Sequence, residues 1–465
     1  MEIMIPLRQG PQSMYEQIYQ YMKTEIRKGN LREGVRLPST RVLAENLKVS
    51  RSTTQMAYDQ LVAEGYIEAL PHKGYFVLRM EELVEVEPEI GGTFIEEKEE
   101  DNNQAEIDFS PRGIDLTHFP YNIWRKVTRN TLAEDKKEMF LTGSPQGESA
   151  LREAIRGYLH SARGVNCQAD QIIVGAGSEY LLMLLYQILG PGRVVAMENP
   201  TYKQAYRVFE SLGYEMAPVE MDSCGMEITF LEKTKADIAY VMPSHQYPTG
   251  IVMPVLRRQE LLQWAGRKKD RFLIEDDYDS EFRYKGRPIP ALQGLDKIGK
   301  VIYMGTFSKS IAPAIRIGYL VLPQSLLAIY QRRLKFYAST VSRIDQNIIY
   351  QFLIDGHYER HLNRMRAIYK GKHDVLLSQL KRLEPDFQIQ GEYAGLHILL
   401  TSRHNRLEKW LVEQAEKMGV KVYGLSSYYI HQHHNNRPST VILGYANLSE
   451  EQIKRGVELL CKAWE

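Results

Sequence analysis

The most reactive combination of residues in the sequence is a lysine that follows an apolar strand and precedes an arginine. The run Val301–Tyr303 predicts a buried strand, and Lys309 lies beyond its end, next to Ser308. Arg316 follows seven residues after Lys309. A lysine amine forms an imine with an aldehyde, and hydroxyl and guanidinium groups bind phosphate through charge-assisted hydrogen bonds. We therefore predict that Lys309 binds a phosphorylated aldehyde, with Thr306, Ser308 and Arg316 on its phosphate.

A single Ser-Lys pair in a loop more often marks an exposed lysine, so a second strand decides the interpretation. The apolar run Phe272–Ile274 leads to Asp276, 33 residues before Lys309, and to Tyr278. Pyridoxal phosphate (PLP) requires a carboxylate that keeps its ring nitrogen protonated, because the ring then accepts electrons. It also gains from a phenol beside its ring hydroxyl. We predict these two roles for Asp276 and Tyr278, with PLP as the cofactor.

The composition limits the class of protein. The chain has 465 residues, 43% of them hydrophobic, which suffices for a large core and more than one domain. The net charge of +1 says nothing about partners. The three cysteines are scattered, without the spacing of a metal site or a disulfide framework. No stretch resembles a signal peptide or is long enough to span a bilayer. We expect a cytoplasmic protein without a metal.

Charge divides the chain into parts. Residues 81–106 contain eleven Asp and Glu against one Lys, together with a proline and two glycines. Such a stretch buries no core and predicts an acidic, flexible linker. We therefore expect a small domain at residues 1–79, a linker at 80–106 and a large domain at 107–465, whose small subdomain begins at about residue 345.

The small domain shows the pattern of three helices and a hairpin. Apolar residues recur at helical spacing from Tyr15 to Ile26. Ser39 or Thr40 is a suitable N-cap for a second helix, and a third helix begins near Ser50. The second helix is expected to bury Val42, Leu43 and Leu47. Two short strands then surround residues 71–74, so the pattern predicts a winged helix-turn-helix.

The exposed face of the third predicted helix suits DNA. Arg51 and Gln55 lie one helical turn apart, and such side chains bind guanine and adenine edges in the major groove. Lys73 and His72, at the tip of the wing, suit phosphate or the minor groove. A three-helix module that binds a protein remains the alternative, because residues 1–78 carry only ten Lys and Arg against eight Asp and Glu.

Motifs of the large domain resemble those of aminotransferase class I proteins of PLP fold type I. They are Tyr247–Gly250, Asp276 with Tyr278, Ser308 with Lys309, and Arg316, and the resemblance runs from about residue 107 to the C-terminus. It implies an α/β domain, with a mainly parallel sheet flanked by helices and a C-terminal α+β subdomain. It also implies that Tyr202 stacks on the cofactor ring and that a helix N-terminus completes the phosphate site through Gly177, Ser178 and Glu179.

Two positions depart from the aminotransferase pattern. Tyr247 stands where these enzymes have an asparagine on the ring hydroxyl. Ile442 stands where they have an arginine that binds the substrate α-carboxylate. Either the ligand is not a simple α-amino acid, or another arginine binds it, for which Arg437 is a candidate.

The small domain resembles the GntR family of winged-helix repressors. The resemblance rests on Leu37–Arg41 and Val49–Thr54. In that family the DNA-contacting positions correspond to Arg41, Ser50, Arg51, Ser52, Gln55 and Gly74. Gln55 replaces an arginine of a known member, so its base preference is expected to differ.

The combination of both domains resembles the MocR/GabR family of transcriptional regulators over the whole chain. It implies a PLP-dependent, DNA-binding regulator that senses an amine, an amino acid or PLP itself through an aldimine at Lys309. It also implies a head-to-tail homodimer that contacts two DNA half-sites. The competing interpretation is a working aminotransferase with an attached DNA-binding domain. A regulator is preferred over an enzyme, because of Tyr247 and Ile442, while the presence of Lys309, Asp276 and Tyr278 leaves half-reactions of transamination possible.

Overall fold

The computed structural model describes most of the chain, and contacts divide it into two compact units, Met1–Asn102 and Asn103–Glu465. The described residues are 3–8, 12–79, 105–133, 137–284, 286, 289–391, 393–404, 406–430 and 438–465. Nearly all of the predicted linker at 80–106 lies outside them, and so does Arg437. No helix in these ranges is long and apolar enough to cross a membrane.

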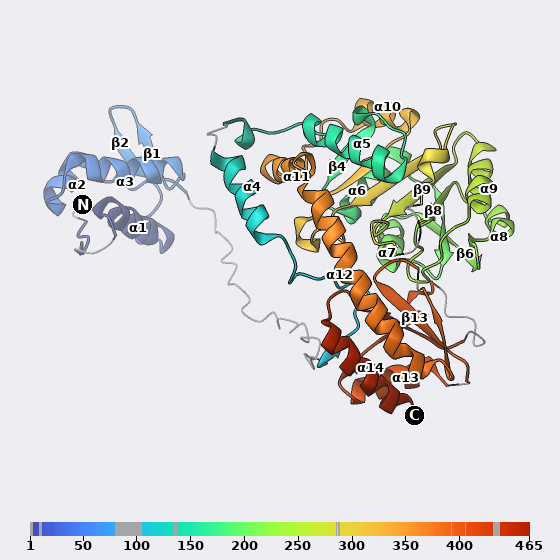
Figure 1. The fold of residues 1–465 in the computed structure, drawn as a ribbon. Helices are drawn as coiled ribbons and strands as arrows, with labels where there is room; N and C mark the ends of the chain where they lie inside the picture. Colours follow the sequence, from blue (N-terminus) through green and yellow to red (C-terminus); the bar gives the residue numbers. More distant parts are fainter. Residues whose placement is uncertain are drawn as a thin grey trace. The chain divides into compact units, whose positions relative to one another are not determined.

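The first unit is a three-helix module with a two-stranded wing (Figure 1). Its elements are α1 (Met14–Arg27), α2 (Thr40–Leu47), α3 (Arg51–Ala63), β1 (Ile67–Leu70) and β2 (Gly74–Val77). The side chains of Ser39 and Ser50 accept hydrogen bonds from the first turns of α2 and α3, which satisfies backbone donors that a helix start leaves free. The predicted winged helix-turn-helix is thereby confirmed.

Polar bonds inside this unit join α2 to α3. The buried Thr54 hydroxyl donates to the carbonyl oxygen of Thr40 at 2.8 Å, and the Tyr58 hydroxyl donates to that of Pro38 at 3.0 Å. The prediction that Val42 lies in the core is wrong, because its side chain is 45% exposed, whereas Ala44 is buried. The short helix turns a narrower face to the core than the apolar pattern predicts.

An eight-stranded sheet forms the centre of the second unit. Its strand order is β4-β11-β10-β9-β8-β5-β6-β7. The strands β10, β9, β8, β5 and β6 run parallel to one another. Strand β11 is antiparallel to both β10 and β4, and β7 is antiparallel to β6. The strands are β4 (Ile172–Gly175), β5 (Val194–Asn199), β6 (Glu215–Asp222), β7 (Gly225–Met226), β8 (Ile238–Val241), β9 (Phe272–Asp277), β10 (Val301–Thr306) and β11 (Gly318–Val321).

Helices cover both faces of this sheet, because strands buried on both sides need apolar cover. One face packs on α6 (Ser178–Leu189), α7 (Lys203–Ser211) and α10 (Gln324–Arg333). The other face packs on α5 (Ser149–Arg163), α8 (Ile228–Lys233), α9 (Val255–Gly266) and α11 (Arg343–Ile354). The predicted α/β architecture with a mainly parallel sheet is therefore confirmed.

A smaller layer of antiparallel strands and helices completes the second unit. Its sheet has the order β12-β13-β16-β15, built from β12 (Phe387–Gln390), β13 (His397–Ser402), β16 (Thr440–Gly444) and β15 (Tyr423–Gly424). The helices α12 (His357–Leu380), α13 (Glu408–Lys417) and α14 (Glu450–Trp464) contribute to the same core. This arrangement is the expected α+β subdomain.

The segment that follows the linker region is fixed to this smaller layer. Strand β3 (Ile107–Asp108) pairs in parallel with β14 (Val420–Lys421). The buried Asp115 carboxylate forms an ion pair of 2.7 Å with Lys372, whose ammonium also donates to the carbonyl oxygen of Ala446. These bonds hold residues 107–115 in place, and with them the turn at Pro111 that reaches the site described below.

We predict that Asp115→Ala destabilises the second unit by about 3 kcal/mol, because it leaves the buried ammonium of Lys372 without its partner. Burial opposes ionisation of Asp115, but hydrogen bonds from Lys372 and His118 outweigh it and hold its pKa below the usual value. The stability it contributes is therefore present above the unfolded pKa of about 4 and lost as pH falls through the lower folded pKa. Thermal unfolding between pH 3 and 7 measures this.

The matched control is Glu458→Gln, which removes an exposed ion pair with Lys462. Its melting temperature is expected to equal that of the wild type. An equal melting temperature for Asp115→Ala would show that the buried pair does not stabilise the segment.

Candidate cofactor and effector site

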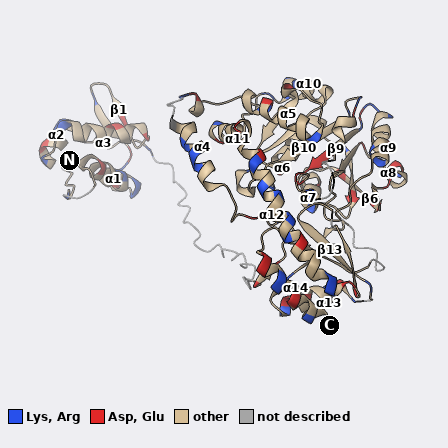
Figure 2. Ribbon diagram, in the orientation of Figure 1, with Lys and Arg blue, Asp and Glu red and all other residues tan. Residues whose placement is uncertain are grey.

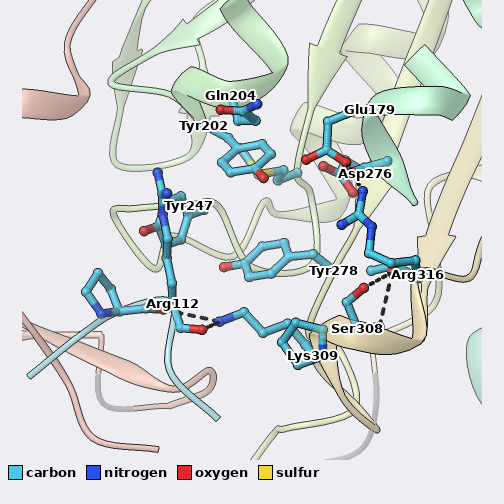
Figure 3. A pocket seen from close by; sticks show the side chains of 15 residues that line it. Arg112, Glu179, Tyr202, Gln204, Tyr247, Asp276, Tyr278, Ser308, Lys309 and Arg316 are labelled. Atoms are coloured by element: carbon cyan, nitrogen blue, oxygen red, sulfur yellow. Dashed lines mark hydrogen bonds and ion pairs between the residues drawn. The ribbon is translucent and has the colours of Figure 1, made fainter. Parts of the chain in front are cut away.

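The sequence-predicted cofactor residues gather around one cavity of about 420 Å³ (Figure 3). Strands β9 and β10 are parallel, with Asp276 opposite Met304, so both deliver their following residues to the same edge of the sheet. Nine of the ten predicted residues line the cavity: Ser178, Glu179, Tyr202, Asp276, Tyr278, Thr306, Ser308, Lys309 and Arg316. The tenth, Gly177, lies directly behind Arg316.

Lys309 reaches across the cavity to the chain that precedes α4 (Tyr121–Ala133). Its ammonium donates hydrogen bonds to the carbonyl oxygens of Arg112 at 2.9 Å and Pro111 at 3.3 Å. Burial lowers the pKa of this ammonium to about 8, although Asp279 opposes the shift. A larger fraction of the amine is therefore neutral near pH 7.5 than for an ordinary lysine, and the neutral amine is the form that attacks an aldehyde.

Asp276 is a buried carboxylate without a basic partner. It is 6% exposed, and the Tyr240 hydroxyl donates to it. Burial raises its pKa to about 7, and the neighbouring Asp277 and Asp279 add to the shift. No lysine or arginine in the described residues forms an ion pair with it. The protonated nitrogen of a pyridine ring complements such a carboxylate, so this part of the cavity fits PLP.

Tyr278 is held by a buried histidine and carboxylate. The Tyr278 hydroxyl lies 2.9 Å from Nδ1 of His245, which lies 2.9 Å from Oδ2 of Asp279. A Cβ atom at Gly395 would lie 1.9 Å from the His245 ring, so this glycine makes room for the ring. His245 and Asp279 were not among the predicted site residues, and no local pattern identifies a residue that acts through a tyrosine.

The opposite end of the cavity has donors for a phosphate. The Thr306 hydroxyl donates to Ser308 Oγ at 3.0 Å. Helix α6 begins at Ser178 with Gly177 as its N-cap, so its first backbone N–H groups face this end of the cavity and favour an anion. A Cβ at Gly177 would lie 2.5 Å from Nη2 of Arg316 and its φ is +88°, which requires glycine here.

Glu179 forms an ion pair with Arg316. The Arg316 guanidinium donates to Oε2 of Glu179 at 2.7 Å, as Figure 3 shows. A carboxylate repels phosphate, so only the backbone N–H of Glu179 suits the predicted phosphate role. The Glu179 carboxylate therefore competes with a phosphate for the Arg316 guanidinium.

The far wall of the cavity contains aromatic rings and one guanidinium. The ring of Tyr202 lies 6.0 Å from that of Tyr247, whose hydroxyl bonds the Tyr428 hydroxyl at 3.0 Å. Ile442 is fully buried in the core of the large sheet and its flanking layer, so it offers nothing to a carboxylate. Arg112 lines the cavity instead, and sequence analysis missed it because only the folded chain brings residues 111–112 to Lys309.

The residues predicted to contact DNA lie largely on the surface of the first unit. Arg41, Ser50, Arg51, Ser52 and Lys73 are exposed, as is His72. Arg41 forms an i,i+4 pair with Glu45, and Figure 2 shows both charges on α2. The Gln55 amide donates hydrogen bonds to Asp59 and to the Tyr75 hydroxyl. To donate to a DNA base, this amide would have to give up one of these bonds. Gly74 has φ +107°, beside Arg36.

Two family models match the chain. Residues 115–460 match the model of aminotransferase class I and II, and residues 14–77 match that of bacterial regulatory proteins of the gntR family. The chain is 40% identical over 453 residues to the uncharacterized HTH-type transcriptional regulator YdeL of Bacillus subtilis, with 97% of each chain covered. It is 31% identical to the probable rhizopine catabolism regulatory protein MocR of Rhizobium meliloti, covering 97% of this chain and 94% of that one.

Solved structures resemble the second unit. The multiple substrate aminotransferase of Thermococcus profundus is 26% identical, with a TM-score of 0.68. The match covers 77% of this chain and 90% of that one.

The lowered pKa of Lys309 predicts how PLP uptake by the PLP-free protein depends on pH. Because the neutral amine reacts, the rate is expected to rise about tenfold per pH unit below pH 8 and to level off above it. The change in visible absorbance of PLP measures the rate, with Lys309→Ala as background. A rate that continues to rise up to pH 10 would contradict a pKa near 8.

The contact between Glu179 and Arg316 predicts that Glu179→Gln tightens PLP binding. Removal of the carboxylate frees Arg316, and because the two side chains are 34% and 51% exposed, the expected gain is only about threefold. Arg316→Gln is expected to weaken binding. Equilibrium dialysis of PLP measures both, and weaker binding by Glu179→Gln would show that Glu179 positions Arg316 for the phosphate.

Proposed function

Because this chain belongs to the MocR-type group of GntR-family transcriptional regulators, which carry an aminotransferase class I and II domain, we propose that it binds PLP at Lys309 and uses it to sense a primary amine. The observation that supports this most strongly is the cavity that joins a lysine of lowered pKa, a buried unpaired carboxylate and a phosphate-binding end. The two domains then act as sensor and DNA reader in one polypeptide.

Each end of the cavity suits one part of the cofactor. Arg316, Ser308 and the N-terminus of α6 would bind its phosphate, and Asp276 would hold its ring nitrogen in the protonated form. Bound PLP supplies an aldehyde carbon with which primary amines condense. Tyr278 would donate a hydrogen bond to the ring hydroxyl, while His245 and Asp279 hold the phenol in place.

The bonds of Lys309 suggest how ligand binding reaches the rest of the chain. Its amine donates to the carbonyl oxygens of Pro111 and Arg112. These residues lie in the segment that follows the linker region. Strand β3 and the Asp115 ion pair join that segment to the smaller layer. Only a free Lys309 amine can donate these bonds, so an incoming amine that displaces Lys309 from the cofactor would allow them to form. We infer that the change biases the dimer between arrangements of its two DNA-binding units, with the difference in binding free energy between the states as the driving force.

A working aminotransferase is the second candidate, because Lys309, Asp276 and Tyr278 all line the cavity. The buried Ile442 weighs against it, since no arginine holds an α-carboxylate at that position. Turnover of an amino acid with 2-oxoglutarate well above the level of Lys309→Ala would favour this candidate.

Replacement of the lysine tests the regulatory proposal. Lys309→Ala is expected to bind its own upstream DNA with wild-type affinity at fixed salt, because the first unit is untouched, and to lose every response to added amine. Lys297→Ala, which removes an exposed lysine, is expected to respond normally. Gel-shift titrations in the presence of excess PLP measure both, and an unaltered amine response in Lys309→Ala would refute sensing at this residue.

Substitutions in the first unit distinguish base contacts from phosphate contacts. Arg51→Ala is expected to weaken binding to the specific site by about tenfold or more and to relax sequence preference. Lys73→Ala is expected to weaken binding to all sequences. It is also expected to reduce the slope of log K against log salt concentration by about one, because one phosphate contact is lost. Arg27→Ala, on the exposed face of α1, is the control. Equal affinity of Arg51→Ala and wild type would favour the protein-binding alternative for this unit.

A further inference from the structure

A second cavity of about 380 Å³ lies next to the first. The two share Pro111, Arg112 and Gln204 as lining residues, so they meet along one wall. The second cavity is lined by three cationic side chains, Arg112, Lys203 and Arg207, and no Asp or Glu is among the lining residues. Such a lining attracts an anion.

The three cations have no acidic partner in the part of the chain that the structure describes. Lys203 and Arg207 lie four residues apart on α7 and face the same cavity. Burial lowers the pKa of Lys203, and the nearby charge of Arg207 lowers it further. Lys203 is half-buried and Arg207 is exposed. Like charges at this spacing repel weakly, and an anionic ligand between them would remove that repulsion.

Arg112 connects this cavity to the reactive lysine. Its main-chain carbonyl accepts the hydrogen bond from Lys309 Nζ at 2.9 Å, while its side chain extends along Tyr247 (Figure 3). Burial raises the pKa of the Tyr247 hydroxyl, and the guanidinium of Arg112 opposes that effect, which places the positive charge near this ring. One ligand can therefore have its amine at Lys309 and an acidic group beside Arg112.

We propose that the second cavity binds the acidic group of the effector through Arg112, Lys203 and Arg207. This inference rests on the proposed function and defines its ligand class: a primary amine with a carboxylate, phosphonate or phosphate several bonds from the nitrogen. The acid lies away from the reacting carbon, because the position of Ile442 offers no cation there. The effector amine would add to the carbon that is joined to Lys309 as an imine. A carbon–nitrogen bond to the effector forms, a proton passes from the effector nitrogen to the lysine nitrogen, and the bond to Lys309 breaks, without oxidation or reduction.

The test compares amines that differ only in the acidic group. PLP-loaded full-length protein, in which borohydride reduction and mass spectrometry have located PLP on Lys309, is titrated with L-glutamate and L-glutamine, and with 5-aminopentanoate and pentylamine. The visible absorbance of PLP gives the apparent Kd. At least one acid is expected to bind tenfold more tightly than its uncharged counterpart. Arg207→Gln is expected to reduce that ratio below threefold, and the exposed control Lys235→Gln to preserve it.

A second measurement does not depend on PLP. Glutarate, which has no amine, is expected to raise the melting temperature of PLP-free wild type and Lys235→Gln, but not that of Arg207→Gln. If Lys309 fails to retain PLP while glutarate still binds through Arg207, the proposed function fails and the anion site stands. Equal affinity within every amine pair would overturn the inference. It would be overturned also if glutarate stabilised Arg207→Gln as much as wild type, which would indicate an adventitious ion only.

Discussion

The site depends on the burial of one carboxylate, Asp276, at the carboxyl end of a central parallel strand. The apolar strands on either side remove it from water, and its carboxylate accepts a hydrogen bond from the Tyr240 hydroxyl. A buried acid without a cation is costly in its ionised form, which is why its pKa rises to about 7. Under the proposed function the pyridine nitrogen of PLP would supply a positive partner for this carboxylate.

The same sheet edge explains why the other groups converge. Lys309 follows β10, which pairs in parallel with the strand of Asp276, and α6 begins with its free N–H groups on the neighbouring side. The lysine is not isolated in the cavity, because it bonds to carbonyl oxygens of residues 111 and 112. That segment belongs structurally to the smaller layer and lies next to the linker region in the sequence. The reacting nitrogen of Lys309 therefore contacts a segment that follows the linker region in the sequence.

Local sequence predicted well those features that depend on strand ends and helix caps. The spacing of Asp276, Tyr278 and Lys309 placed all three at one cavity. The starts of α2, at Ser39 or Thr40, and of α3, near Ser50, were also predicted, and the structure has Ser39 and Ser50 as the N-caps. The contributions of His245, Asp279 and Arg112 were not predictable, because each acts through a contact between residues distant in the chain. Val42 was assigned to the core from periodicity alone, whereas packing of the short α2 leaves it exposed. Arg437, the arginine suggested for the effector, lies outside the described residues, and Arg112 is the guanidinium found on the cavity wall.

The most direct measurement is the DNA response of protein in which PLP has been fixed to Lys309 by borohydride reduction. Reduction makes the bond between Lys309 and the cofactor permanent without changing the sequence, so no amine can displace the lysine. Affinity for the upstream DNA is measured at fixed salt, with and without amine, for reduced and untreated protein. We expect both forms to bind DNA, and only the untreated form to change its affinity when amine is added. An equal change in the reduced form would contradict the claim that displacement of Lys309 transmits the signal.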